Sequence, residues 1–376
     1  MSVLKVVITG QAGFVGTHLY NTLKLDSKFS VIEFEDNFFQ NQNKLEEIVK
    51  DVDVVVHLAA MNRHEDPQVI YDTNLLLVNK LISSCENTAS KPHILFSSSS
   101  QESSDNLYGD SKLKGRELLE AWARKNEAIF TGMVIPNVFG SFGRPNYNSV
   151  VATFCHKVAN NESPEIHVDS ELKLIYVNKL VDTIITKIKD KESDPSSVER
   201  FVVPNQYNVK VSRVLELINS FKTDYLGNGV FPDLSDSFNK DLFNTFRTYV
   251  NENHFPFFIE KHTDNRGSFV EIARTNSAGQ FSFSTTVPGI TRGNHYHTRK
   301  AERFAVIKGK ARIQLRKIGT NDIINYYLDG EKPSFVDMPI WTTHNITNVG
   351  EEELVTLFWI NEPYNQLDSD TYFEEV

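Results

Sequence analysis

The first half of the chain alternates short apolar runs, rich in Val and Ile, with helical patterns. Runs that are apolar at successive positions indicate strands buried on both faces, which is typical of a parallel sheet covered by helices. The predicted strands are Val3–Thr9, Phe29–Glu33, Val52–Leu58, His93–Ser97 and Ala128–Ile135. The predicted helices are Val15–Leu25, Lys44–Lys50, Asp72–Asn87, Ser111–Asn126, Ser149–Asn160 and Phe238–Val250. We therefore expect an α/β fold with a doubly wound parallel sheet of Rossmann type over residues 1–250.

From about Phe255 the pattern changes to short alternating strands separated by turn residues such as Gly309 and the Asp329-Gly330 pair. The predicted strands here are Ser268–Arg274, Gln280–Val287, Glu302–Ile307, Ala311–Lys317, Ile323–Leu328 and Leu354–Ile360. This pattern predicts a second, all-β domain over residues 251–376, a small antiparallel barrel or jelly roll.

Composition narrows the class of protein. The 376 residues carry a formal net charge of -10, and no basic stripe of the kind that nucleic acid requires is present. No apolar run reaches the roughly 18 residues of a membrane span. The two cysteines, Cys85 and Cys155, predict reduced thiols, not a disulfide. We expect a cytoplasmic protein that binds neither nucleic acid nor membrane.

A glycine-rich loop closes the first predicted strand. Gly10, Gly13 and Gly16 stand at the spacing of a dinucleotide site, where they permit a tight turn, close approach of phosphate and close packing of the following helix. Phe14 and Val15 lie in the same loop, at the start of the helix. The alternative is that the glycines serve only the turn. Position after a strand and before a helix favours a nucleotide cofactor.

Acidic residues follow the second predicted strand. Glu33, Glu35 or Asp36 would accept a hydrogen bond from a ribose 2′-hydroxyl, which favours NAD(H) over NADP(H). The alternative interpretation is a solvated acidic loop.

Tyr108 and Lys112 stand one helical turn apart, and a run of four serines, Ser97–Ser100, ends the fourth predicted strand. A neighbouring ammonium stabilises phenolate, so we expect Lys112 to lower the pKa of Tyr108 and make it a general acid for a carbonyl receiving hydride. The serines fall at the carboxyl edge of the sheet, where ligands bind in such folds. The alternative is a serine-rich loop that bonds its own backbone.

His295 and His297 point to one side of a strand because side chains alternate with period two. With Glu302 and the distant His344, they form a nitrogen-rich set for one divalent metal. Zinc is the expected ion, although iron, manganese and nickel accept the same ligands. The alternative is a sugar pocket without metal in which a histidine acts as base.

Residues 1 to about 245 resemble the extended short-chain dehydrogenase/reductase family. The elements that carry the resemblance are the glycine loop, His57-Leu58-Ala59-Ala60, Asn74, the serine run, Tyr108 with Lys112, and Pro136-Asn137-Val138-Phe139-Gly140. It implies that Ser99 (or Ser98) assists, Tyr108 donates a proton, and Lys112 holds Tyr108 and the nicotinamide ribose. The cofactor contacts it implies are Gly10, Gly13, Phe14, Val15, Gly16, Leu58, Ala59, Ala60, Asn74 and Lys112.

Residues 255–376 resemble the cupins, with Trp341 where a glycine is usual. The two halves together are similar to bifunctional capsular polysaccharide enzymes that make UDP-2-acetamido-2,6-dideoxy-β-L-talose on the route to UDP-N-acetyl-L-fucosamine. This implies C3 epimerisation of a UDP-linked 4-keto-6-deoxy amino sugar in the cupin, then C4 reduction with NADPH, in a homodimer. The predicted sugar-nucleotide contacts are Gln101, Asn137, Arg144, Asn146 and Asn148, for which the alternative is loop residues without a ligand.

Two other functions stay open at this point. The substrate of an epimerase–reductase of the rhamnose type would be a dTDP-4-keto-6-deoxyhexose, and the residues do not discriminate uracil from thymine. A non-catalytic protein that senses NAD(P) or a sugar would need no intact Ser/Tyr/Lys set.

Overall fold

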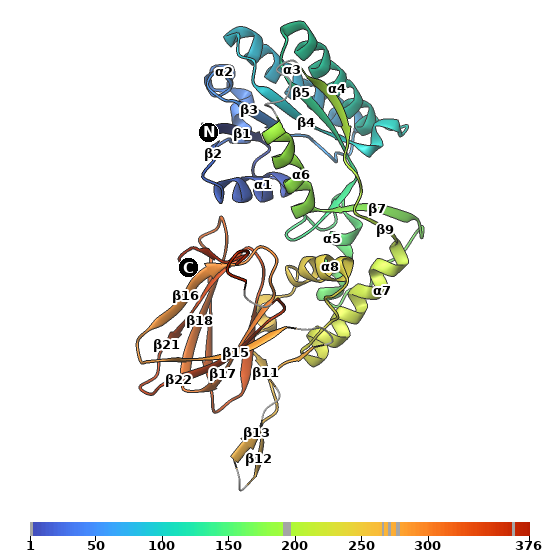
Figure 1. The fold of residues 1–376 in the computed structure, drawn as a ribbon. Coiled ribbons are helices and arrows are strands. Elements are labelled where there is room, and N and C mark those ends of the chain that lie inside the picture. The colour runs from blue at the N-terminus through green and yellow to red at the C-terminus, as the bar shows by residue number, and fades with distance from the viewer. Residues whose placement is uncertain (1–2, 191–196, 265–266, 270–271, 276–278, 363–364) are drawn as a thin grey trace. The chain divides into compact units, whose positions relative to one another are not determined.

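The computed structural model describes residues 3–190, 197–264, 267–269, 272–275, 279–362 and 365–376. The chain forms two compact units (Figure 1). The sheet unit contains Met1–Val150 and Asp169–Lys210, and the barrel unit contains Val151–Val168 and Val211–Val376. The units therefore alternate along the chain. The predicted division into 1–250 and 251–376 has one boundary, whereas each unit here contains two segments of the chain. That division stays a prediction.

The sheet unit is built on a parallel sheet with the strand order β2-β1-β3-β4-β5-β8. Its strands are β1 (Leu4–Thr9), β2 (Phe29–Ile32), β3 (Val54–His57), β4 (His93–Ser99), β5 (Phe130–Ile135) and β8 (Val198–Val202). Strand β3 is buried at all four positions, as the run of Val54, Val55 and Val56 predicts. Strand order reverses between β1 and β3, so the crevice for a ligand lies at their carboxyl ends. The predicted doubly wound parallel sheet is confirmed.

Helices cover both faces of this sheet (Figure 1). They are α1 (Phe14–Lys24), α2 (Gln42–Lys50), α3 (Pro67–Thr88), α4 (Leu107–Asn126) and α6 (Val177–Lys189). One apolar core contains residues of α2, α3 and α4, and a second contains residues of α1 and α6. Short elements complete the unit: η1 (Asp36–Gln40), η2 (Ser100–Ser103) and a small sheet of β6 (Asn137–Phe139), β7 (Glu171–Tyr176) and β9 (Tyr207–Lys210).

The barrel unit has two five-stranded sheets whose pairings are antiparallel, which confirms the predicted all-β domain. The first contains β11 (Phe257–Phe258), β20 (Ser334–Met338), β17 (Glu302–Lys308), β22 (Leu354–Ile360) and β15 (Gln280–Thr286). The second contains β19 (Ile323–Asp329), β18 (Lys310–Lys317), β21 (Thr342–Asn348), β16 (Thr291–Tyr296) and β23 (Tyr372–Phe373). An apolar core that includes Phe304, Ile313 and Ile346 draws residues from both sheets.

The barrel unit also includes elements outside these two sheets. They are α5 (Val150–Ala159), α7 (Val211–Phe221), η4 (Lys222–Gly227), β10 (Val230–Phe231), α8 (Ser237–Arg247), η5 (Glu252–His254), β12 (His262–Asp264), β13 (Gly267–Phe269) and β14 (Arg274–Thr275). The predicted strand Ser268–Arg274 overlaps β13 and β14, and its residues 270–271 lie outside the described residues.

A buried ion pair between two barrel strands also bonds to the segment that precedes α8. Arg303 and Asp337 are each 1% exposed and form two hydrogen bonds, Nε to Oδ1 at 2.8 Å and Nη2 to Oδ2 at 3.0 Å. Asp337 also accepts from the Tyr225 hydroxyl at 2.5 Å, and Arg303 donates to the carbonyl of Gly229 at 2.6 Å. Tyr225 and Gly229 precede α8, so these contacts explain why residues after 210 pack with the barrel unit.

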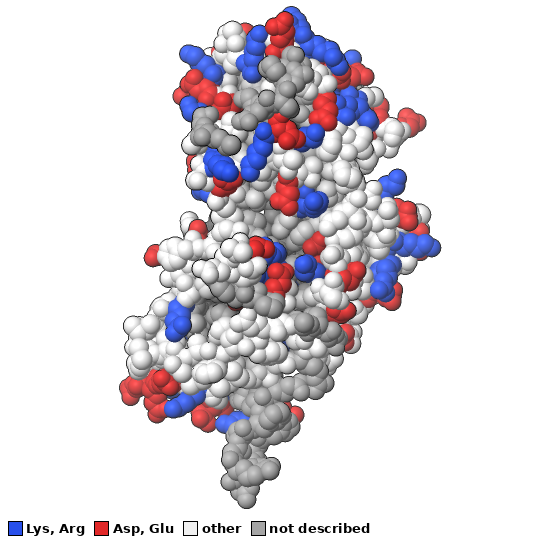
Figure 2. Space-filling view, viewed as in Figure 1, with Lys and Arg blue, Asp and Glu red and all other residues white. Residues whose placement is uncertain are grey.

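The surface carries both signs of charge. On the face drawn in Figure 2, Lys and Arg are interspersed with Asp and Glu, and that face has no broad basic area. Within the described residues, the structure has no helix with the length and apolar character of a membrane span.

Candidate functional site

The glycine loop joins β1 to α1 in the geometry of a phosphate cradle. Gly10 has a φ of 70°, and a Cβ there would lie 2.8 Å from the backbone nitrogen of Ala59. A Cβ on Gly16 would lie 2.1 Å from the carbonyl oxygen of Gly10, so only glycine lets α1 pack this close. Gly13 caps α1 without a side chain, and the first turn, which begins at Phe14 and Val15, carries no acidic residue. The backbone amides of this first turn are therefore available to an anion, and the diphosphate of a dinucleotide fits there.

A second loop follows β3 at the same edge of the sheet. Leu58 donates to the carbonyl of Thr9 at 3.1 Å, and Ala59 donates to the Thr9 hydroxyl at 3.3 Å. Leu58, Ala59 and Ala60 are half-buried beside the glycine loop. The three residues therefore lie at the edge of the sheet where the cofactor is expected, and their contact with it stays a prediction.

Asn74 lies behind that loop, on α3. Its amide nitrogen donates to the carbonyl of Met61 at 3.1 Å and to the Ser111 hydroxyl at 3.0 Å, while its oxygen accepts from the Met61 amide at 2.7 Å. Both amide protons are thus used within the protein. Asn74 fixes the loop after β3, and its predicted contact with the cofactor stays a prediction.

Three serines at the end of β4 have different partners. The Ser97 hydroxyl donates to the carbonyl of His57 at 3.1 Å, and the Ser98 hydroxyl bonds to the carboxylate of Glu102. The Ser99 hydroxyl instead accepts from the amide of Gln101 at 3.1 Å and hydrogen-bonds to Tyr108. Ser99 is therefore the strand serine that faces the phenol, and its predicted role in catalysis stays a prediction.

The pKa of Tyr108 moves opposite to the prediction. Burial raises it to about 12, with a smaller lowering from the Ser99 hydrogen bond and a small rise from Tyr147. The Lys112 ammonium donates to the carbonyl of Ser97 at 2.8 Å and lies 5.9 Å from the centre of the Tyr108 ring. The expected lowering is wrong for this structure, because burial dominates the shift and the lowering contribution comes from Ser99, not from Lys112. A phenol that keeps its proton is suited to donate it.

Lys112 itself is buried and only 4% exposed. Burial lowers the pKa of its ammonium to about 8. The same charge contributes to the pKa of the neighbouring buried His57, which burial and Lys112 lower to about 3. At neutral pH the site therefore holds one positive charge, on Lys112, next to a neutral imidazole.

The loop after β6 carries most of the predicted sugar contacts. Arg144, Asn146 and Asn148 are exposed, as are Gln101 in η2 and Asn137 at the start of β6. The Arg144 guanidinium lies 5.0 Å from the ring centre of Tyr147. The structure places these residues near the carboxyl edge of the sheet, and their contact with substrate stays a prediction.

Two residues of this region were missed by the sequence analysis. Arg63 donates from one nitrogen to the carbonyls of Asn146 at 3.1 Å and Tyr147 at 3.0 Å. It thereby holds the left-handed conformation of Asn146, whose φ is 54°. Tyr147 raises the pKa of Tyr108, so it faces the phenol. Neither belongs to a local motif, because both contacts join segments more than thirty residues apart in the chain.

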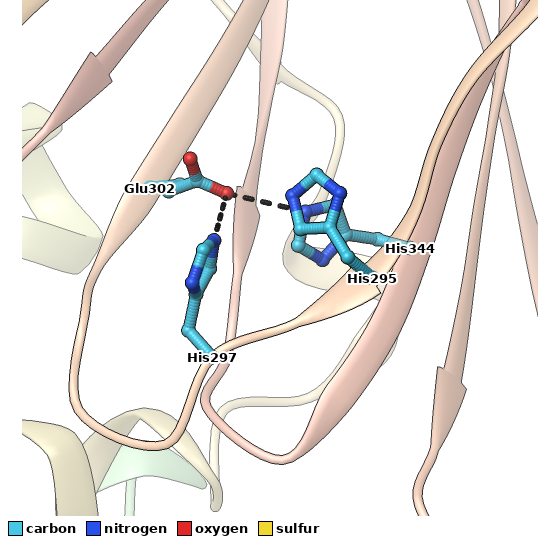
Figure 3. A group of neighbouring side chains, drawn as sticks. All are labelled: His295, His297, Glu302 and His344. Atoms are coloured by element: carbon cyan, nitrogen blue, oxygen red, sulfur yellow. Dashed lines mark ion pairs between the residues drawn. The ribbon is translucent and has the colours of Figure 1, made fainter. Parts of the chain in front are cut away.

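Inside the barrel unit, four side chains converge from both sheets (Figure 3). His295 is in β16, His297 follows that strand, Glu302 begins β17 and His344 is in β21. One ligand atom from each lies within 4.8 Å of the others. His297 Nε2 and His344 Nε2 lie 2.9 and 3.1 Å from the same Glu302 oxygen. The structure thus brings together all four predicted ligands.

Hydrogen bonds on the far side of the rings settle which nitrogen faces the group. Nδ1 of His297 donates to the carbonyl of Asp370, and Nδ1 of His344 donates to the carbonyl of Thr342 at 3.2 Å. A carbonyl only accepts, so Nδ1 carries a proton, and in the neutral imidazole Nε2 is the nitrogen with the free lone pair. Among the described residues, neither Nε2 nor Glu302 Oε2 has a hydrogen bond of good direction, although all three atoms are buried. A divalent cation fits such a donor set.

The electrostatics of the group depend on the pairing of Glu302 with the histidines. Burial alone raises the pKa of the Glu302 carboxyl, but its contacts with His297 and His344 outweigh burial and lower it. Burial alone lowers the pKa of His297, but the Glu302 contact outweighs burial and raises it, whereas burial lowers the pKa of His295 to about 4, and its neighbour His344 adds to this. A bound cation would replace the proton that His297 shares with Glu302, because an ionised carboxylate and a neutral imidazole are the states that ligate a metal.

Trp341 is the residue that departs from the cupin pattern, and its backbone explains the usual glycine. It has a φ of 55° and is buried. Its amide donates to the carbonyl of His297 at 2.7 Å, and its ring stacks on Tyr296 at 5.6 Å between centroids. This turn therefore holds the segment of His297 even without glycine.

The chain resembles known proteins over both units. Residues 6–209 match the model of the NAD dependent epimerase/dehydratase family, and residues 262–372 match the polysaccharide biosynthesis C-terminal domain. The chain is 35% identical over 378 residues, 98% of each protein, to UDP-2-acetamido-2,6-beta-L-arabino-hexul-4-ose reductase of Pseudomonas aeruginosa.

Solved structures give the same result. The capsular polysaccharide assembling protein CapF of Staphylococcus aureus has a TM-score of 0.63 and 36% identity, with 99% of this chain and 100% of that chain covered. The enzyme WbmF of Bordetella bronchiseptica, solved with NADH, has a TM-score of 0.54 at 14% identity over 66% of this chain and 92% of that chain. The second likeness concerns the fold alone.

Proposed function

The chain belongs to the NAD dependent epimerase/dehydratase family, and from that membership we propose that it is a bifunctional enzyme of nucleotide-sugar metabolism. In this proposal the barrel unit epimerises carbon 3 of a UDP-linked 4-keto-6-deoxy amino sugar. The sheet unit then reduces carbon 4 with NAD(P)H. The product would be UDP-2-acetamido-2,6-dideoxy-β-L-talose, a precursor of UDP-N-acetyl-L-fucosamine for a surface polysaccharide.

One observation carries the proposal: a single chain holds two separate polar sites of different chemistry. Ser99, Tyr108 and Lys112 stand at the carboxyl edge of a parallel sheet, where a reductase of this family needs them. His297, Glu302 and His344 converge inside a barrel. The similar protein of Pseudomonas aeruginosa is named as a reductase of a UDP-linked hexul-4-ose, which supports a keto-sugar as substrate.

In the sheet unit, a bound reduced nicotinamide would supply the hydride. The residues of this chain handle the proton and the charge. The Tyr108 phenol, whose pKa of about 12 keeps it protonated, would give its proton to the carbonyl oxygen as hydride reaches the carbon. Ser99 would hydrogen-bond the same oxygen, and the positive charge of Lys112 would stabilise the phenolate that remains.

In the barrel unit, one divalent ion, zinc by our proposal, would be held by His295, His297, Glu302 and His344 and would supply positive charge to an enediolate. Epimerisation removes a proton from carbon 3, next to the ketone, and returns it on the other face. An alternative works without metal, with one imidazole as base. The two differ in metal content, which elemental analysis of purified protein measures directly.

We propose NADPH as the reductant because the family that the chain resembles uses it, with NADH as the alternative that the acidic residues after β2 favour. The Glu33 carboxylate accepts a hydrogen bond from Tyr20 at 3.3 Å, and Glu35 accepts from Asn37 at 3.1 Å. An acidic group at this edge favours a free ribose 2′-hydroxyl. Comparing kcat/KM for the two reductants decides the choice. We also propose a homodimer, for which light scattering gives the mass in solution.

Two measurements test the two activities separately. Incubating the protein with a UDP-4-keto-6-deoxy-HexNAc in deuterated water, without nicotinamide, should place deuterium at carbon 3. Adding NADPH should then consume the reductant and yield the 4-hydroxy sugar. Faster turnover of a dTDP-linked keto sugar would move the proposal to the rhamnose type. Tight cofactor binding with no turnover of any keto sugar would replace it by a sensing function.

A further inference from the structure

The last described segment of the chain contributes no atom to the His/Glu group, yet it contacts the segments that carry all three histidines. We call residues 368–375 the C-terminal strap. Strand β23 of the strap pairs with β16, and His295 is opposite Phe373 in that pairing. The backbone nitrogen of Glu374 donates to the carbonyl of Asn294 at 3.0 Å. The strap therefore forms part of the wall that holds His295.

Asp370 is the residue of the strap that holds the loop of His297. It is 3% exposed, and its main-chain carbonyl accepts the Nδ1 proton of His297. Its carboxylate accepts four more hydrogen bonds from the next three residues, Thr298 N at 3.1 Å, Thr298 Oγ1 at 2.6 Å, Arg299 N at 3.0 Å and Lys300 N at 3.2 Å. One buried carboxylate thus fixes the whole turn between two metal-ligand candidates, His297 and Glu302.

The strap also reaches the third histidine and the buried ammonium of Lys300. The Thr343 hydroxyl, next to His344 in the chain, bonds to the carbonyl of Glu374. The Lys300 side chain is 2% exposed, and its ammonium donates to the carbonyl of Ser369 at 2.7 Å. A buried ammonium and a buried carboxylate are retained only where their partners are well placed. This turn therefore has one favoured geometry.

Asp370 adopts an unusual backbone conformation, with a φ of 42°. Residues held in sparsely populated backbone regions persist where the surrounding structure fixes them, and they cluster at functional sites. Outer hydrogen-bond partners of ligating histidines set the tautomer and ring orientation, and removing them weakens metal binding. The strap is therefore expected to affect metal binding through the orientation of the histidines.

We propose that Asp370 is a positioning residue for the metal, and that ordering of the C-terminal strap and binding of the ion stabilise each other. The inference rests on the proposed metal site. By linkage, whatever the strap contributes to metal affinity, the ion contributes equally to the stability of the strap.

The test compares two carboxylates of the same segment. Asp370→Asn keeps the shape but removes the charge that four donors share. Asp368→Asn is the matched control, because the Asp368 side chain is 64% exposed and makes one 2.8 Å ion pair with Arg299. Competition with a chromophoric chelator measures the Zn²⁺ dissociation constant of the full-length protein. We expect Asp370→Asn to weaken Zn²⁺ binding about 10- to 100-fold, and Asp368→Asn by less than about threefold.

A second measurement separates positioning from a merely structural role. The loss of unfolding stability caused by Asp370→Asn is determined with and without Zn²⁺. Coupling to the ion makes the loss larger with Zn²⁺ present, whereas a structural role alone makes the two losses equal, which would overturn the inference. If Asp370→Asn does not fold, hydrogen exchange of the wild-type strap decides: Zn²⁺ should slow exchange at the Glu374 amide, and unchanged exchange would overturn the inference.

The two proposals fail differently. Wild-type protein that binds no divalent ion would overturn the metal assignment and this inference together. Wild-type protein that binds Zn²⁺ tightly, with Asp370→Asn binding as tightly, would overturn the inference and leave the metal site in place.

Discussion

The candidate site in the sheet unit consists largely of backbone amides left exposed by glycines, whereas the candidate site in the barrel unit consists of closely packed polar side chains. At the first site, Gly10, Gly13 and Gly16 leave backbone amides uncovered at the start of α1. At the second, two imidazole nitrogens lie 2.9 and 3.1 Å from one carboxylate oxygen, and all three atoms are buried without good hydrogen bonds. We expect the first arrangement to be stable while empty, and the second to be satisfied by the cation proposed above.

The difference teaches that the two sites should respond oppositely to loss of their ligands. Uncovered amides in a loop remain solvated when no phosphate is bound, so the sheet unit should keep its structure without cofactor. The ligand nitrogens and oxygen of the His/Glu group are buried away from water, so the barrel unit should lose stability when the proposed ion is removed. Four predictions follow from this contrast, with the largest effect first.

Replacing Tyr108 by Phe should impair only the reduction proposed for the sheet unit. The variant lacks the proton that the buried phenol donates, so we expect kcat for reduction to fall by about 10²- to 10⁴-fold. Stopped-flow oxidation of NADPH measures the rate. Deuterium exchange at carbon 3 and the metal content should match the wild type, because Tyr108 belongs to the sheet unit. A variant that reduces the sugar at full rate would rule out Tyr108 as the acid.

Replacing Arg303 by Met should destabilise the barrel unit alone. Asp337 would remain as a buried carboxylate without its partner, and we expect a loss of about 3–5 kcal/mol in the unfolding free energy. Urea denaturation followed by the fluorescence of Trp341 and Trp359 in a Trp122→Phe background reports on this unit. As a control in the same unit, removing the exposed ion pair of Arg213 and Glu216 should cost at most about 1 kcal/mol. Equal losses from both changes would show that the buried pair has no special weight.

Removing the metal should sharpen the contrast between the two units. With free Zn²⁺ at about 1,000 times its dissociation constant, binding adds about 4 kcal/mol, so chelation should lower the melting temperature of the barrel unit by roughly 8–16 °C. The fluorescence of Trp122 should show no such shift for the sheet unit. A drop of equal size in both units would mean that they unfold together, and no drop would remove the argument for an ion.

The pH dependence of reduction concerns the sheet unit and gives the smallest effect. Burial lowers the pKa of Lys112 to about 8, so its positive charge disappears as the pH rises through that value. We expect kcat/KM for reduction to fall about tenfold per pH unit above it. Tyr108, with a pKa of about 12, stays protonated there and does not cause the fall. Lys112→Arg keeps its charge, so its profile should be flat; the same fall in this variant would assign it to another group.

The elements that could be predicted from sequence are those whose pattern is local. Runs such as Val54–Val56 predict buried strands, and the five predicted strands and four of the predicted helices of the sheet unit are confirmed with shifted ends. Strand β21 was missed because Thr342–Asn348 is polar, yet all seven residues are buried. Strand β16 was predicted only around His295, because its first half contains Gly293 and is exposed. Polar strands of this kind are stabilised by distant partners, which a local pattern does not show.

The same distinction applies to the sites. The glycine loop and the His295/His297 pair are motifs of adjacent residues, and the structure brings them into the expected arrangements. Burial is not visible in a spacing, so the direction of the pKa of Tyr108 was predicted wrongly. Asp370 was missed as a partner of His297 because 73 residues separate them. What sequence omits here is which side chains become enclosed, and by which remote segment.

The alternation of the two units along the chain has a practical consequence for separating the enzyme into its halves. The polypeptide passes from one unit to the other after residues 150, 168 and 210. A fragment that starts at residue 251 would lack Tyr225, which bonds to Asp337, and Arg247, which donates to the carbonyl of Met338 at 2.6 Å. A barrel unit produced on its own should therefore begin near residue 211 and be supplied with the α5 segment, grafted through a linker or added as a peptide.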